Sequence, residues 1–297
     1  MDTFFKRILL ALDLTEMDDK ILSFAEYIIR GKEVNKMYVI HIVPHLFNTN
    51  FDISSGFYQK FGVGQSLSEK VLKSCESKLN NYFKDRNLNL EIIVLEGQPY
   101  QQLLDWQENN PMELIVLGNK NKSKGSGITA RRFAHKSKSN LLFVSDAAVN
   151  KIEDILVPVD FSEHSTKAIN SALSIKRKAA NEVNIHLLYI EDLLSLARFY
   201  GLNLDEIVLE EVVRETKNTL DEFLESTGFD KDLFSREVIA NTDTSVSKQL
   251  CRFVQDKEVQ LVVMGAQGHS GYDRFVFGSV AEKFVDQCKE ASVLVVR

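Results

Sequence analysis

Glycines and a serine at fixed spacing make residues 261–282, LVVMGAQGHSGYDRFVFGSVAE, the stretch of this chain best suited to chemistry. Its opening apolar run, LVVM, has the composition of a strand buried on both faces of a parallel sheet and ends at Gly265. Gly268 follows after two residues, and Gly278 and Ser279 follow after nine more. Apolar residues then recur at helical spacing, so the pattern predicts a strand, a glycine loop and a helix start.

A phosphate group is the natural ligand of such an arrangement. Glycines bring backbone N–H groups close to a ligand, and the first turn of a helix presents unpaired N–H donors at its positive end. The hydroxyl of Ser279 adds a donor, so a polyphosphate needs no lysine here. The alternative is an ordinary turn followed by an ordinary helix cap, but the full spacing between a buried strand and a helix favours the phosphate site.

Length, composition and charge exclude several classes of protein. The 297 residues suffice for two domains, and 44% hydrophobic residues supply two cores. No apolar stretch approaches the roughly 20 residues that cross a bilayer, and residues 1–13 are interpreted as a first strand rather than a signal peptide. A net charge of -6 argues against general nucleic-acid binding. We therefore expect a cytoplasmic protein without a membrane or nucleic-acid partner.

Other residues with reactive side chains give no catalytic or metal signature. Cys75, Cys251 and Cys288 form no CxxC pair and are expected to be small apolar residues on helices. The six histidines lack metal-ligand spacing. His269 follows Gly268, where a solvent-facing position is favoured over a phosphate contact. The run Ser162, Glu163 and His164 is interpreted as a helix cap, with a nucleophile and its base as the alternative. No catalytic residue and no metal ligand is predicted.

Strands and helices alternate along the first half of the chain, which predicts a parallel α/β sheet. The expected strands are 7–13, 37–43, 90–95, 114–117 and 141–144. Ser66 and Glu69 predict a capping box that opens a helix, and further helices are expected over 100–108 and from 128 to 135. A long connection before Ser66 carries the aromatic residues Phe47, Phe51, Phe57, Tyr58 and Phe61.

The second half repeats the first at a shift of 147 residues. The segment 155–160, ILVPVD, matches 8–13, and Gly265 matches Gly118. The expected strands of this copy are 155–160, 183–190, 237–240, 261–264 and 293–296, with a long helix over 205–227 that Gly228 ends. We expect domains at 1–148 and 149–297, which pack tightly because the join lacks the composition of a flexible linker.

This arrangement resembles the universal stress protein family in its tandem, two-domain form. The resemblance rests on ILVPVDFSEHS (155–165), LLYIED (187–192), and the GAQG and GSVAE ends of the opening stretch. It implies an α/β fold of two Rossmann-like domains, similar to adenine nucleotide alpha hydrolases. Each domain would be a five-stranded parallel sheet in order 3-2-1-4-5 with helices on both faces, and ligands would bind at the switch point beside strands 1 and 4.

The resemblance also implies an ATP site in the second half. Asp160 would bind the ribose hydroxyls, Ile190 would offer backbone hydrogen bonds to adenine, and Val159 and Met264 would line the adenosine pocket. The glycine loop would surround the ribose and phosphates, and the helix start would contact the phosphates. The implied nucleotide-binding set is Val159, Asp160, Ile190, Met264, Gly265, Gln267, Gly268, Gly278, Ser279 and Val280. The alternative for Asp160 is a helix cap or turn acid.

The first half departs from this pattern. Its loop is four residues shorter, Asn121 replaces the second glycine, and Ile128 stands at the serine position, although Asp13 persists. We therefore expect this degenerate loop not to bind ATP as the second half would. A basic cluster around it is expected to be a solvated surface, with an anion or partner site as the alternative. The cluster comprises Lys120, Lys122, Lys124, Arg131, Arg132, Lys136 and Lys138.

The function that follows is an ATP-binding stress-response regulator that acts through conformation or association. ATP, with or without Mg²⁺, would be held in the second domain, with weak ATPase activity at most. A slow Mg²⁺-dependent hydrolase or phosphotransferase in the same cleft and a structural dimerisation module with an empty cleft are the alternatives. The last strand of each half would be an exposed apolar edge, so we expect the two edges to pair as an internal pseudo-dimer, with a homodimer formed through other faces.

Overall fold

The computed structural model describes residues 5–30, 33–43, 64–84, 86, 88–120, 126–194, 199, 205–268 and 277–297. The expected aromatic connection before Ser66 lies outside these residues. The first half contains β1 (Arg7–Leu12), α1 (Met17–Ile29), β2 (Lys36–Val43), α3 (Gly64–Phe83), β3 (Leu90–Glu96), α4 (Pro99–Asn109), β4 (Leu114–Asn119), α5 (Ser126–Ala134) and β5 (Asn140–Ser145).

The second half repeats this order. It contains β6 (Asp154–Pro158), α6 (Glu163–Lys178), β7 (Asn184–Asp192), α8 (Glu206–Thr227), the short 3₁₀ helix η1 (Lys231–Leu233), β8 (Ser235–Asn241), α9 (Val246–Asp256), β9 (Leu261–Gly265), α10 (Ser279–Gln287) and β10 (Ser292–Val296). The α/β alternation expected from the sequence is confirmed, with element ends shifted by one or two residues. Gly228 ends α8 in the left-handed conformation, as expected, at φ 75°.

One prediction about a helix start is wrong. α3 begins at Gly64, so Ser66 lies within its first turn and is not the cap. Helix starts are the least certain feature of a sequence pattern, because several residues near a boundary can serve as the first turn. The helix nevertheless covers the predicted apolar stripe, since Val71, Cys75 and Leu79 are buried.

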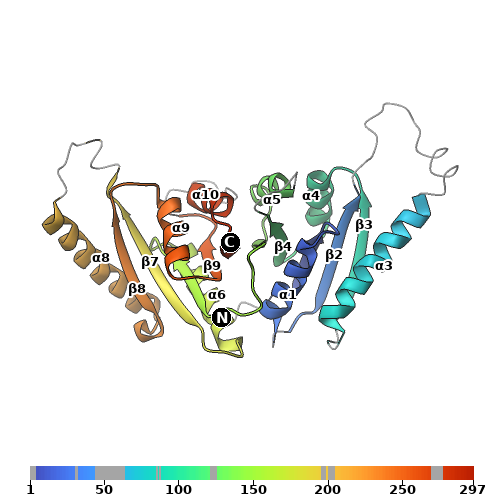
Figure 1. The fold of residues 1–297 in the computed structure, drawn as a ribbon. Helices are drawn as coiled ribbons and strands as arrows, with labels where there is room; N and C mark the ends of the chain where they lie inside the picture. Colours follow the sequence, from blue (N-terminus) through green and yellow to red (C-terminus); the bar gives the residue numbers. More distant parts are fainter. Residues whose placement is uncertain are drawn as a thin grey trace.

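All ten strands form one sheet in the order β3-β2-β1-β4-β5-β10-β9-β6-β7-β8. Read from the middle outwards, each half has the order 5-4-1-2-3, which is the order that the resemblance implies. Neighbouring strands within each half are parallel, while β5 and β10 pair antiparallel with Leu142 opposite Leu294. The expected edge pairing is confirmed, and Figure 1 shows the two halves side by side across it.

Alternating strand residues feed a core on each face of the sheet. Ile8 and Leu10 join one core, which α1, α3, α6 and α8 cover, and Leu9 joins the other, beneath α4, α5, α9 and α10. Both cores continue across the join, because Leu142 and Leu294 lie in the first and Phe143 and Val293 in the second. The two halves therefore share their hydrophobic interior rather than touching through a polar surface.

Polar contacts close the connection between the halves. The Lys20 Nζ donates to the carbonyl oxygen of Ala148 at 2.9 Å. The Tyr27 hydroxyl donates to Asn181 Oδ1 at 3.1 Å and lies 3.4 Å from the carbonyl oxygen of Ile152. These contacts join α1 to the connection at Ala148 and Ile152 and to Asn181 after α6, as expected for a join without linker composition.

Candidate functional site

The predicted site residues of the second half come together. All ten line one cavity of about 410 Å³ beyond the carboxyl ends of β6, β7 and β9, where the glycine loop and the start of α10 close it. This is the switch point of the second half, because β6 and β9 are neighbours in its sheet and their connections run to opposite sides. From β6 the chain continues to β7 on one side, and from β9 it continues to β10 on the other. The cavity has the size typical of small-molecule sites.

Asp160 lies in the turn after β6, and its two carboxylate oxygens have different surroundings. Its Oδ1 accepts hydrogen bonds from the Ser165 hydroxyl at 2.6 Å and from the Ser162 N–H at 3.1 Å. Its N–H donates to the Ser165 Oγ at 2.9 Å. Oδ2 lies against Gly268, where an added Cβ would overlap it. The turn-acid alternative thus describes Oδ1, while Oδ2 faces the glycine loop of the cavity.

Backbone strain next to Asp160 fixes this orientation. Phe161 has a φ of 63°, a left-handed conformation that costs a non-glycine residue about 1 to 2 kcal/mol. Its ring stacks on Tyr189 with ring centroids 4.6 Å apart and meets Phe223 edge-on at 5.5 Å. These aromatic contacts hold the strained residue in place, and so they hold the carboxylate before it.

Glycines of the loop are required because other groups pass close to them. A Cβ on Gly265 would lie 2.6 Å from the His164 Cβ. A Cβ on Gly278 would lie 2.9 Å from the carbonyl oxygen of Ala266, which accepts the Gly278 N–H at 2.7 Å. The Gly278 N–H is therefore engaged within the protein, and this glycine shapes the loop instead of donating to a ligand.

The start of α10 provides the donors. Its first backbone hydrogen bond runs from the Glu282 N–H to the carbonyl oxygen of Gly278 at 2.9 Å. Among the described residues, none accepts a hydrogen bond from the N–H groups of Ser279, Val280 and Ala281. All three residues line the cavity, so these N–H groups lie at the positive end of the helix, where an anion would find donors.

Apolar side chains form the opposite wall. Val159 and Met264 are buried, and the Val159 N–H is satisfied by the carbonyl oxygen of Leu188 at 2.9 Å. Val246 and Leu250 of α9 complete this wall, and neither was predicted as a site residue. Sequence reasoning also missed Ala281, whose position as the third residue of α10 could have indicated it. The cavity thus joins an apolar wall, one carboxylate oxygen and the N–H groups of a helix start.

No histidine of the described residues lines the cavity. His164 packs against Gly265, and burial together with the nearby Lys167 lowers the pKa of its ring. Ser162 caps α6 by accepting the Ser165 N–H, so the predicted cap is confirmed. His269 lies outside the described residues. No group of three or more potential metal ligands occurs among the residues that the structure describes.

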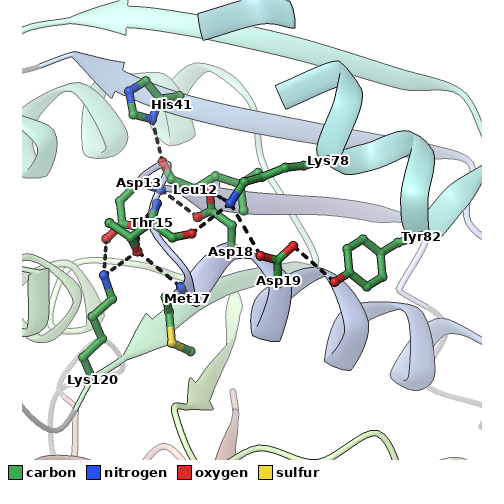
Figure 2. Close-up of polar contacts among 10 residues, drawn as sticks. All are labelled: Leu12, Asp13, Thr15, Met17, Asp18, Asp19, His41, Lys78, Tyr82 and Lys120. Carbon is green, nitrogen blue, oxygen red and sulfur yellow. Dashed lines mark hydrogen bonds and ion pairs between the residues drawn. The ribbon is translucent and has the colours of Figure 1, made fainter. Parts of the chain in front are cut away.

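In the first half, the acid that matches Asp160 is already paired. Figure 2 shows Lys120 reaching from the end of β4 to Asp13 and Thr15. The Lys120 Nζ lies 2.7 Å from both Asp13 Oδ2 and Thr15 Oγ1. Burial raises the pKa of Asp13, but hydrogen bonds from Lys120 and Thr15 outweigh it and hold that pKa below its usual value. Both oxygens of this carboxylate therefore have partners, since Thr15 also donates to Oδ1.

A second carboxylate strengthens this network. Asp18 stands where the second half has Ser165, and its Oδ1 accepts the Asp13 N–H at 3.0 Å. Burial raises the pKa of Asp18, and Lys78, 3.1 Å from its Oδ2, opposes that shift. Each of the two aspartates is therefore paired with a lysine, Asp13 with Lys120 and Asp18 with Lys78. Lys120 belongs to the basic cluster.

Two other basic residues of the cluster also contact groups within the protein. Arg131 pairs with Asp286 of α10 at 2.8 Å, and Arg132 lies over the Tyr100 ring at 4.6 Å from its centroid. Lys122 and Lys124 lie outside the described residues. Arg132, Lys136 and Lys138 are exposed, so the described part of the cluster combines contacts within the fold with the solvated surface that the sequence predicts. The three cysteines are free thiols, with Cys75 and Cys288 buried and Cys251 half-buried.

The fold and the cavity together define a tandem, doubly wound α/β protein with a cavity at the switch point of its second half. No helix in the described part of the chain is long and apolar enough to span a membrane. The chain belongs to the universal stress protein family, whose model matches residues 4–145 and 151–297.

Individual relatives agree with this assignment. The universal stress protein YxiE of Bacillus subtilis is 26% identical over 147 residues, which cover 48% of this chain and 97% of that protein. The universal stress protein MJ0531 of Methanocaldococcus jannaschii is 27% identical over 154 residues, 50% of this chain and 84% of that protein. Each therefore corresponds to one half of the duplication.

Among solved structures, a universal stress protein from Archaeoglobus fulgidus covers 99% of this chain and 98% of its own, with a TM-score of 0.63 and 18% identity. A functionally unknown protein from Pseudomonas aeruginosa PAO1 covers 99% and 93%, with a TM-score of 0.62 and 14% identity. At these identities the likeness concerns the fold. It extends over both halves and includes their tandem arrangement.

Proposed function

We propose that this protein is an ATP-binding regulator whose single nucleotide site lies in the second half. The observation that carries the proposal is the convergence of an apolar wall, the Asp160 carboxylate and the start of α10 in one cavity. The domain boundary is assigned between residues 148 and 149, in the interval between the two segments that match the family. The ten residues implied by the resemblance are proposed as its nucleotide contacts, with Gly278 shaping the loop.

Each part of ATP matches a part of the cavity. Adenine fits the wall formed by Val159, Met264 and the α9 residues, because the faces of its flat ring pack well on apolar side chains. Ribose hydroxyls are donors and suit the Oδ2 of Asp160, which would repel phosphates. The phosphates suit the N–H groups at the start of α10, which lie at the other side of the glycine loop.

A divalent ion would accompany the phosphates. Asp160 is the one carboxylate among the described lining residues, so Mg²⁺ would be held chiefly by phosphate oxygens and water. A regulatory role fits a site built from neutral donors around a nucleotide. Bound ATP would stabilise the second half, and through the shared cores it would influence the first.

The proposal is tested by changing the matched acids of the two halves and titrating each variant with ATP. Asp160→Asn keeps an oxygen to cap the turn but removes the charged acceptor for the ribose. We expect at least about tenfold weaker ATP binding, because a hydrogen bond to a charged group contributes about 1.5 to 3 kcal/mol.

The control is Asp13→Asn, the same change in the paired cleft of the first half. It should leave ATP affinity as in the unchanged protein. Equal ATP affinities of the unchanged protein and the two variants would show that Asp160 does not contact ATP. No ATP binding by any of the three would refute an ATP-binding function.

A further inference from the structure

Helix α10 spans the distance between the cavity and the first half. Its first three residues line the cavity, whereas its last turns lie against β4 and α5 of the other half. A short helix of nine residues moves as one unit, so contacts at one end set the position of the other. The contacts with the first half therefore bear on where the N–H groups at the cavity point.

The far end of α10 is bonded to the end of β4. The carbonyl oxygen of Val285 accepts a hydrogen bond from Asn119 Nδ2 at 3.0 Å and from Lys289 Nζ at 2.8 Å. Asn119 is buried, with 4% of its surface exposed. An amide from the other half and a cation thus satisfy a carbonyl that would otherwise lack a partner at the end of this helix. Asn119 belongs to the loop whose sequence does not fit a nucleotide site.

Two polar side-chain pairs join the α5 region of the first half to α10 at matching positions. Arg131 pairs with Asp286 at 2.8 Å, and His135 Nε2 lies 3.0 Å from Glu282 Oε1. Glu282 and Asp286 are four residues apart on α10, so they lie on one face. His135 directly follows α5 and donates its N–H to the carbonyl oxygen of Arg131 at 3.4 Å, so these two residues also lie on one face. Aligning Gly127 with Gly278 makes Arg131 the counterpart of Glu282 and His135 the counterpart of Asp286. The two copies have therefore diverged into complementary surfaces.

The beginning of α10 is also held by the first half. Phe277, the residue before the helix cap, is 1% exposed. Its ring meets His135 edge-on with centroids 5.7 Å apart and stacks with Phe143 of β5 at 6.3 Å. α5 is itself fastened to the second half, because Arg297 Nε donates to the carbonyl oxygen of Ser139 at 3.1 Å and its guanidinium contacts that of Ala134.

We propose that residues of the first half, chiefly Asn119, Arg131 and His135, position the start of α10 and thereby set the affinity of the second-half cavity for phosphate. This inference rests on the proposed nucleotide site. The first half, whose loop does not fit a nucleotide site, would then position the phosphate-binding end of the cavity in the second half. The adenosine end of the cavity is formed by β6, β7 and α9, all of the second half.

The test compares ATP with adenosine, which lacks the groups that α10 would hold. Arg131→Asp places a carboxylate opposite Asp286, so the pair becomes repulsive. We expect ATP affinity to fall by about fivefold, the size of one surface ion pair, and adenosine affinity to stay unchanged. Exchanging the charges in the double variant Arg131→Asp with Asp286→Arg should restore ATP affinity.

The matched control is Arg132→Asp, the same charge change one residue along α5, where the side chain contacts Tyr100 within the first half. It should leave both affinities as they are. His135→Gln offers a milder change at the other pair and replaces Arg131→Asp if thermal melting shows that the latter is unfolded.

An unchanged ratio of ATP to adenosine affinity in both α5 variants would overturn the positioning role. So would equal losses for the two ligands, or the same loss of ATP affinity in the Arg132→Asp control. If the unchanged protein binds adenosine but not ATP, or binds neither, the proposed function fails as well, and the positioning role fails with it.

Discussion

The turns that follow β1 and β6 have the same backbone conformation beside the acid and differ in what contacts that acid. Asp13 and Asp160 each precede a residue in the left-handed conformation, Leu14 at φ 58° and Phe161 at φ 63°. In the first half Lys120 pairs with the acid, whereas the second half has Gln267 at the matching position and leaves Asp160 Oδ2 at the cavity. The same position of the fold thus carries an ion pair in one half and a carboxylate at a cavity in the other.

A second substitution accompanies the first. Ser165, which shares hydrogen bonds with Asp160, is matched by Asp18, and Lys78 balances the added charge. A buried carboxylate is costly unless it is paired, so the extra acid and the extra cations belong together. The comparison teaches that the first cleft is not merely a weakened copy. It is a self-contained ionic network.

The largest expected effect comes from Gly278→Val. A Cβ at this position would lie 2.9 Å from the carbonyl oxygen of Ala266 and 3.5 Å from the Gln267 Cα, so the loop has to move away from the start of α10. ATP binding should be lost. The measurement is equilibrium titration with ATP on variants whose far-ultraviolet circular dichroism is unchanged.

The matched change in the first half is Gly127→Val, at the start of α5. It should leave ATP binding intact, because valine is a better helix residue than glycine and the first cleft holds no nucleotide in this account. Retained binding in Gly278→Val would show that the loop is only a turn.

A smaller effect should separate the two strained residues. Phe161→Gly relieves the left-handed strain but removes the contacts with Tyr189 and Phe223, so the free energy of unfolding should fall by about 1 to 2 kcal/mol. Leu14→Gly removes a similar strain from a half-buried side chain, and should change that free energy by less than about 1 kcal/mol. Urea denaturation of both variants gives the comparison, and equal losses would mean that the aromatic contacts do not hold the turn.

The smallest effect concerns the ionic network of the first cleft. Lys120→Met removes the cation beside Asp13, so the pKa of Asp13 should rise toward its usual value, as followed by nuclear magnetic resonance titration. The free energy of unfolding at neutral pH should fall by no more than about 1 kcal/mol, because the pair is partly exposed.

The sign of the pH dependence follows from the lowered pKa of Asp13. Its stabilising contribution is fully present above the unfolded pKa, about 3.9, and is lost as the pH falls through the lower folded value. The Lys120→Met variant should therefore lose less stability over this acidic window than the unchanged protein. An unchanged Asp13 pKa in the variant would contradict the pairing.

Sequence patterns were sufficient to predict the strands and helices and to predict which residues of the second half lie together. Buried strands such as 261–264 and the shift of 147 residues predicted two parallel sheets, and the carboxyl ends of parallel strands necessarily meet at one edge. For that reason residues as distant as Asp160 and Ser279 line one cavity.

Contacts between distant side chains could not be read from the sequence. Lys120 was visible as a basic residue, but its pairing with Asp13 depends on the neighbouring positions of β1 and β4. Likewise, the Gly278 N–H was expected to serve a phosphate, and only the fold brings the carbonyl oxygen of Ala266 to it. Packing determines these partners, and local patterns do not record packing.

Calorimetric titration of the unchanged protein with ATP in the presence of Mg²⁺ tests the central claim most directly. The account predicts one nucleotide per chain, because the cavity of the second half is lined by Asp160 and the start of α10 while Lys120 pairs with the acid of the first cleft. Two equal sites per chain would contradict it, since they would show that the first half still binds nucleotide despite this pairing.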